Sequence, residues 1–182
     1  MKHAEPTSPV SFFANVAHLP QKGLVVVVEA DERQRAALAS EYELLSVEGY
    51  RAELVVAPWK RNGVKVSGRV VADITQACIV TLDPVAAHID EPVEALFLPE
   101  QSKLGREGFG SGGEIILDAD GPDSPETFSG DTIDVGALAE QFFGLAIDPY
   151  PRKAGASLDA VGEDEHEESE FQKKLRSLLG KS

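Results

Sequence analysis

The clearest periodicity in the sequence is a two-residue alternation of apolar and polar side chains that begins at Val64. Even positions as far as Leu82 are mostly apolar, and after Pro84 the apolar positions are instead the odd ones Ala87, Ile89, Val93, Ala95 and Phe97. Successive side chains of a strand point to opposite faces, so each stretch predicts a long strand with one buried face and one face in water. A strand from Val64 to Leu82 would extend about 60 Å. Because strands are usually shorter, we expect a bend or bulge near Gly68 or Gln76.

Weaker signals predict the elements before this region. Asp31 and Gln34 form a capping-box pattern, and Leu38, Tyr42 and Leu45 follow at helical spacing, which predicts a helix from Asp31 to Ser46. The apolar run Leu24–Val28 suits a strand buried on both faces. This strand is expected to extend over residues 23–30. Further strands are expected at 10–16 and 47–58, and a tight hairpin turn at Asn62-Gly63.

After the alternating region, a short strand is expected at 114–117, a second at about 127–133, and then a helix from Asp134 to Ile147. Asp134 is the expected N-cap of this helix. Its apolar residues form two stripes, which predicts burial on more than one side, and Pro149 cannot continue it.

These elements predict an α+β fold in which a twisted, largely antiparallel sheet curls toward a barrel and packs with two main helices. The length suits a single domain, at 10–153, after a flexible lead-in at 1–9. We expect a mobile glycine-rich loop at 100–113. Residues 154–182 are expected to form a disordered acidic tail with a short helical segment at its C-terminal end.

The net charge of −14 is concentrated in residues 83–148, where fifteen acidic residues face two basic ones. Such a surface repels phosphate, so the charge argues against a free-standing nucleic-acid binder and favours a basic protein partner. Acidity that merely keeps the domain soluble explains the charge equally well. The chain has one cysteine and no long apolar run, which predicts no internal disulfide, no membrane span and a cytoplasmic location.

Few residues form a plausible catalytic or metal site, and we expect no cofactor. Cys78 lies on the apolar face of its strand, which favours a buried, protonated and inert core thiol. His88, Asp90 and Glu94 share one face of the next strand. They could form a metal-binding facet of a hydrolytic or RNA-processing enzyme, but alternation alone predicts polar residues there.

Residues 149–153 suggest a binding site instead. Tyr150 stands between two prolines beside Arg152 and Lys153, and aromatic and arginine side chains are frequent interface anchors. Packing of Tyr150 back onto the sheet is an equally plausible interpretation. In the tail, Phe171, Leu175 and Leu178 would share a face of a short helix that folds on docking to a partner.

The order of these elements resembles the YceD family, the large ribosomal RNA subunit accumulation proteins, in its alphaproteobacterial form. The resemblance spans about residues 10–156 and is strongest at Val64–Val70, Gln76–Pro84 and Gly130–Arg152. Many relatives carry Cys-x-x-Cys where this chain has Cys78-Ile79-Val80-Thr81, so a metal or redox role of such a pair does not carry over. The family's Phe/Leu/Lys-rich C-terminal tail is matched loosely by residues 171–181.

The resemblance implies a non-enzymatic factor needed for accumulation and processing of the large-subunit (23S) ribosomal RNA, whose gene often neighbours that of a large-subunit ribosomal protein. A large-subunit ribosomal protein or an assembly factor is therefore the expected partner. Contact with rRNA is expected to be weak or indirect and left to Arg152, Lys153 and the basic tail. The sequence does not determine the oligomeric state.

Overall fold

The computed structural model describes residues 8–100 and 125–156. Its elements in chain order are β1 (Phe13–Asn15), β2 (Leu24–Glu29), α1 (Glu32–Glu41), β3 (Ser46–Trp59), η1 (Lys60–Asn62), β4 (Gly63–Ala77), β5 (Pro84–Pro99), β6 (Glu126–Phe128), β7 (Thr132–Asp134) and α3 (Val135–Ala146). Predictions for the glycine-rich loop, the strand at 114–117 and the segment with Phe171, Leu175 and Leu178 lie outside the described residues.

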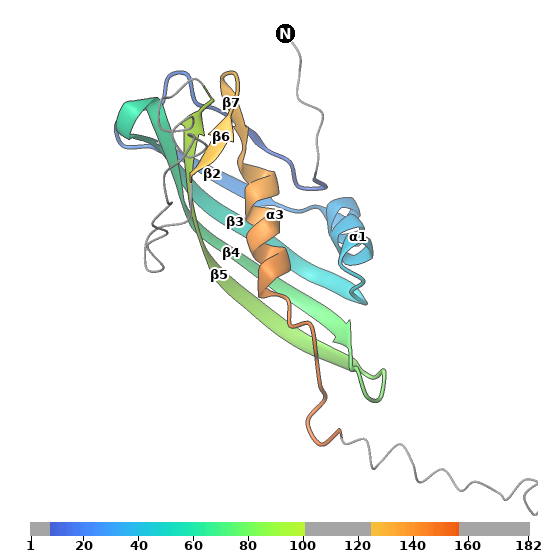
Figure 1. Cartoon of the computed structure of the whole chain (residues 1–182). Coiled ribbons are helices and arrows are strands. Elements are labelled where there is room, and N and C mark those ends of the chain that lie inside the picture. Colours follow the sequence, from blue (N-terminus) through green and yellow to red (C-terminus); the bar gives the residue numbers. More distant parts are fainter. Residues whose placement is uncertain (1–7, 101–124, 157–182) are drawn as a thin grey trace, which may run out of the picture.

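The main sheet has five strands in the order β2-β3-β4-β5-β6, and the predicted α+β class is confirmed. The first four strands are antiparallel neighbours, whereas β6 runs parallel to β5. A separate pair is formed by β1 and β7. Figure 1 shows a strongly curved sheet with α3 across its concave side. The sheet does not close, so the prediction of curling toward a barrel holds only for its curvature.

The alternation that predicted β4 and β5 is confirmed. Even positions of β4 are buried with the exception of Gly68, and Ile89, Val93 and Phe97 are buried on β5. The strand is shorter than expected, because β4 ends at Ala77 and Leu82 is exposed. The bulge is also elsewhere: β4 pairs with β5 without a register shift, and the irregularity lies in β3 between Val47 and Gly49.

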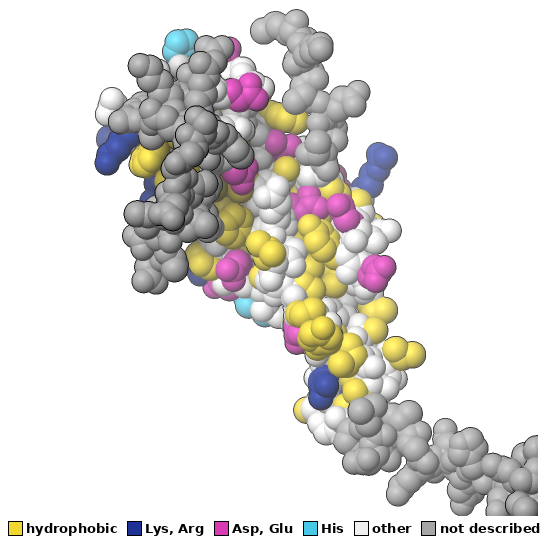
Figure 2. Space-filling model, in the orientation of Figure 1, with side chains coloured by type: hydrophobic (Ala, Val, Ile, Leu, Met, Phe, Trp, Pro, Cys, Tyr) yellow, Lys and Arg dark blue, Asp and Glu magenta, His cyan; other side chains and the backbone are white. Residues whose placement is uncertain are grey.

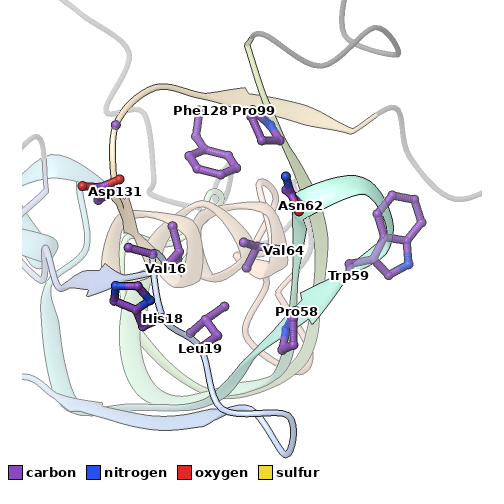
Figure 3. Close-up of a pocket in the computed structure, with 13 residues that line it drawn as sticks. Val16, His18, Leu19, Pro58, Trp59, Asn62, Val64, Pro99, Phe128 and Asp131 are labelled. Atoms are coloured by element: carbon purple, nitrogen blue, oxygen red, sulfur yellow. The ribbon is translucent and has the colours of Figure 1, made fainter.

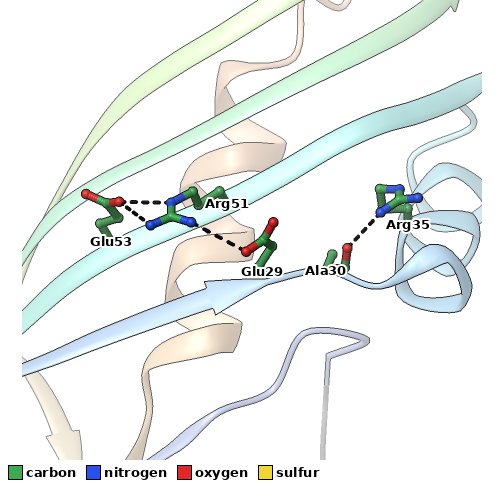
Figure 4. Close-up of polar contacts among 5 residues, drawn as sticks. All are labelled: Glu29, Ala30, Arg35, Arg51 and Glu53. Atoms are coloured by element: carbon green, nitrogen blue, oxygen red, sulfur yellow. Dashed lines mark hydrogen bonds and ion pairs between the residues drawn. The ribbon is translucent and has the colours of Figure 1, made fainter.

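The prediction that strand β2 is buried on both faces is wrong. Val26 and Val28 are buried, but Val25 is 68% and Val27 45% exposed. Burial on both faces belongs to sheets that are covered on both sides. Here β2 is an edge strand, and the convex face carries charged side chains. In Figure 4, Arg51 lies between Glu53, at 2.7 Å, and Glu29, at 3.4 Å.

The first helix begins as predicted and ends early. Both hydrogen bonds of the Asp31–Gln34 capping box are present, and Leu38 is fully buried. The helix stops at Glu41, and Glu43 takes a positive φ of 54°. Leu45 is therefore outside the helix and exposed, contrary to the predicted stripe.

Three shorter predictions change in detail. The strand expected at 10–16 is reduced to β1, and the strand expected at 127–133 is divided into β6 and β7 by a turn with Gly130 at φ 80°. The predicted hairpin joins β3 to β4, but its loop is the single turn η1. Asn62 there has a φ of 62°, the left-handed conformation common at the last loop position.

Helix α3 covers the core. Asp134 caps it by accepting from the Ala137 amide, and Leu138, Ala139 and Phe143 are buried. The ring of Phe143 makes edge-on contacts with Tyr42 and Tyr50, which joins α3 to the end of α1 and to β3. The expectation of burial on several sides is wrong for the last turn, where Leu145 is 83% exposed. In the described part of the chain, neither helix has the length and hydrophobicity to cross a bilayer.

Candidate functional site

Residues 148–153 are attached to residues 76–83 by hydrogen bonds, and we call this contact the end junction. The Gln76 side-chain amide donates to the Asp148 carbonyl at 2.9 Å, and the Ile79 amide donates to the Pro151 carbonyl at 2.9 Å. Pro151 is buried, and the Tyr150 amide donates to the Asp148 carboxylate at 2.9 Å. The chain that leaves α3 is thus fixed in place over the end of β4.

The two basic residues of the junction have different surroundings. The Lys153 ammonium lies 2.9 Å from the Asp83 carboxylate, and this contact lowers the pKa of Asp83. Lys153 is thus already paired within the chain, and its role as a cation presented to a partner stays a prediction. Arg152 is exposed and has no ion-pair partner within the described ranges.

Tyr150 does not pack back onto the sheet, because its side chain is 70% exposed. We use the name end patch for the exposed large apolar residues of the junction and of the last turn of α3, which are Ile79, Leu82, Leu145 and Tyr150. Leu82 is 76% exposed and holds a φ of 60°. Figure 2 shows hydrophobic side chains gathered at this end of the molecule, where the chain leaves the body.

Cys78 lies beneath the end patch and is fully buried, as predicted. Its surroundings include hydrogen-bond donors that the sequence does not predict. The Lys153 amide donates to Sγ at 3.4 Å. This bond, with further hydrogen bonds from the hydroxyl and amide of Thr81, lowers the pKa of Cys78 to about 6 even though burial opposes ionisation. The junction thus directs hydrogen bonds at a sulfur atom that solvent does not reach.

The structure does not assemble the predicted metal facet. His88, Asp90 and Glu94 lie on the convex face of β5, each against a partner on β4. The contacts are His88–Asp73 at 2.7 Å, Asp90–Arg69 at 2.6 Å and Glu94–Lys65 at 2.6 Å. Within residues 8–100 and 125–156, no three His, Cys, Asp or Glu side chains are grouped to hold a metal ion.

One buried carboxyl was not predicted from the sequence. Glu140 of α3 is almost fully buried, and desolvation raises its pKa. Burial and the nearby Glu140 also raise the pKa of Tyr42 to about 12, and the Tyr50 hydroxyl has no hydrogen-bond partner among the described residues. The only sequence signal was a single acidic residue within an apolar helix. These groups face one another inside the protein rather than a substrate-sized cleft.

A cleft of about 630 Å³ lies at the opposite end of the sheet (Figure 3). Val16, Leu19, Val64 and Phe128 give it an apolar lining, and His18 and Asp131 are its titratable groups. These residues come from three distant segments of the chain, so no local motif predicts the cleft. Polar and apolar surface are mixed in its lining, so the cleft by itself points to no class of ligand.

These features define an α+β protein with a curved open sheet, one helix across the concave side, and an exposed apolar patch on a fixed junction. The YceD family model, described as large ribosomal RNA subunit accumulation protein YceD, matches residues 66–177, which is more than half of the chain. The chain belongs to the YceD family. No curated protein and no solved structure matches it.

Proposed function

We propose that this protein is a non-catalytic factor that supports accumulation and processing of 23S rRNA and assembly of the large ribosomal subunit through protein contacts. Membership of a family described by large ribosomal RNA subunit accumulation supports the biological role. The observation that carries the mechanism is the end patch, which presents Leu82, Leu145 and Tyr150 to solvent.

The end patch has the properties of a preformed binding surface. Positive φ is unfavourable for leucine, and such a conformation persists only where the surrounding structure fixes it. The Leu82 amide donates a hydrogen bond to the Cys78 carbonyl at 2.9 Å, and the Cys78 amide donates one to the Asp83 carbonyl at 2.8 Å. A fixed patch loses little conformational entropy on binding, which favours affinity. Tyr150 and Arg152 supply the side-chain types that dominate binding energy at interfaces.

Charge favours a protein over RNA as the direct ligand. Arg51, Lys65, Arg69 and Lys153 are each within 3.4 Å of a carboxylate. These cations would have to leave their partners before they could neutralise phosphate. A large-subunit ribosomal protein or a basic assembly factor is the partner that the net charge of −14 favours.

The test is an affinity pull-down from bacterial lysate, with and without ribonuclease, comparing the wild type with Leu82→Asn and Tyr150→Ala. Asparagine tolerates the left-handed conformation, so Leu82→Asn removes the apolar side chain without new strain. We expect large-subunit proteins to remain after ribonuclease treatment and each variant to weaken capture about tenfold, the equivalent of about 1.4 kcal/mol at an interface anchor. Capture lost on ribonuclease treatment, or unchanged in both variants, would contradict the proposal.

A further inference from the structure

The free edge of β2 is unusually apolar for an exposed strand. No strand pairs with its outer side in the part of the chain that the structure describes. Its sequence from Leu24 to Glu29 contains four consecutive valines, and Leu24, Val25 and Val27 are exposed. Proteins usually protect such edges with charges, prolines or bulges, because open backbone groups pair readily with another strand. Here Glu29 is the only charge on the strand.

The hydrogen-bonding pattern identifies which backbone groups are available. Ala30 donates to Tyr50 at 3.1 Å, and hydrogen-bonded positions alternate along an antiparallel ladder. Even-numbered residues of β2 therefore bond to β3. The amides and carbonyls of Val25, Val27 and Glu29 point toward the free edge. The same residues place their side chains on the convex face, where no described element covers them.

We propose that β2 pairs antiparallel with β2 of a second copy of this chain, about a two-fold axis at Val26. In this register, Val25 of each copy forms the hydrogen-bonded pair with Val27 of the other, and Leu24 faces Val28 on the concave side. Each residue is then opposite a residue whose side chain lies on the same face of the sheet, as antiparallel pairing requires. The two five-stranded sheets then become one continuous sheet.

Charge selects this register over its neighbour. The alternative two-fold axis at Val27 places Val25 opposite Glu29, which sets a carboxylate against an apolar side chain. With the axis at Val26, Glu29 instead faces Gly23 of the second copy, so that the carboxylate meets no apolar side chain. The register that pairs the valines with one another is thus also the one that keeps the carboxylate away from them.

Sedimentation velocity of the full-length protein over a wide concentration range tests the pairing. We expect a concentration-dependent dimer in the wild type and a monomer in Val25→Glu, whose folding is checked by circular dichroism. Leu82→Asn, at the other end of the molecule, is the matched control and should dimerise normally. A wild type that stays monomeric at every concentration, or a dimer that persists in Val25→Glu, would overturn the proposal.

Disulfide trapping tests the register. In a Cys78→Ala background, Val26→Cys should form a covalent dimer under mild oxidation, because non-hydrogen-bonded antiparallel partners have Cα atoms about 4.5 Å apart. Val27→Cys, the self-pair of the competing register, should cross-link far more slowly. Preferential cross-linking at residue 27 would show that the assigned register is wrong. If Val25→Glu still captures large-subunit proteins in the pull-down, the dimer contact and partner binding at the end patch are independent of each other.

Discussion

At the scale of single residues, sequence periodicity predicted burial well and chemical environment poorly. Cys78 was placed inside because it continues the even-numbered face of β4, and it is inside. Its hydrogen-bond donors could not be predicted, because one of them, Lys153, is distant in sequence and is positioned by the end junction. Leu82 shows the same limit: its parity predicted burial, but the chain turns after Ala77 and exposes it.

The thiol of Cys78 leads to a pH prediction. Its folded pKa of about 6 lies below the usual thiol value of about 8.5. A lowered pKa stabilises the folded protein fully above the unfolded value, and this contribution is lost as pH falls through 6. We expect the stability difference between wild type and Cys78→Ala, measured by urea unfolding, to increase steadily from pH 6 to pH 9. A difference independent of pH would indicate a protonated thiol. Thiol reagents should still label the native protein slowly, because Cys78 is not exposed.

At the scale of elements, strands and helices were predicted where a periodic pattern or a cap marked them. The capping box of α1 and the Asp134 cap of α3 both formed as predicted. Helix ends were less predictable, because the end of α1 depends on where β3 must begin pairing with β4. One face of β2 is exposed because β2 lies at the edge of the sheet, and no local sequence pattern specifies that position.

Gly68 of β4 provides a test of how closely β3 and β4 approach. A Cβ at this position would lie 2.0 Å from the Glu53 carbonyl oxygen, a distance that requires the backbone of β3 to move. We expect Gly68→Ala to lower the free energy of unfolding by about 3 kcal/mol or more, as for other severe steric changes. Gly49→Ala is the matched control in β3, since its Cβ would meet only the Asp73 carboxylate at 3.6 Å. Equal stability of the two variants in urea unfolding would refute this account of the strand contact.

At the scale of the whole molecule, composition indicated a protein partner, and the structure adds a reason that composition could not supply. The convex face contains arginine and lysine, yet Arg51, Lys65 and Arg69 lie against carboxylates of neighbouring strands. Cross-strand partners depend on register, so the sequence alone could not show which cations are neutralised. The fold class could be predicted from the sequence, because long strands with alternating apolar and polar side chains make up most of the fold.

The last prediction concerns RNA. We expect full-length protein to bind 23S rRNA fragments weakly, with a shallow salt dependence, because its net charge of −14 repels phosphate and Arg51, Lys65, Arg69 and Lys153 would first have to leave their carboxylates. Removing two paired carboxylates, by Asp90→Asn with Glu94→Gln, frees Arg69 and Lys65 on adjacent strands. This double variant should bind RNA more tightly and with a steeper dependence on salt.

A second double variant, Glu32→Gln with Glu43→Gln, changes the net charge equally but removes carboxylates that pair with no cation among the described residues. It should raise affinity only slightly, since it alters long-range repulsion without freeing a cation. Filter binding over a series of salt concentrations compares the slopes of the three proteins. Tight wild-type binding with a steep slope would mean that the ion pairs open on RNA, and equal slopes in both double variants would mean that net charge, rather than pairing, restrains the contact.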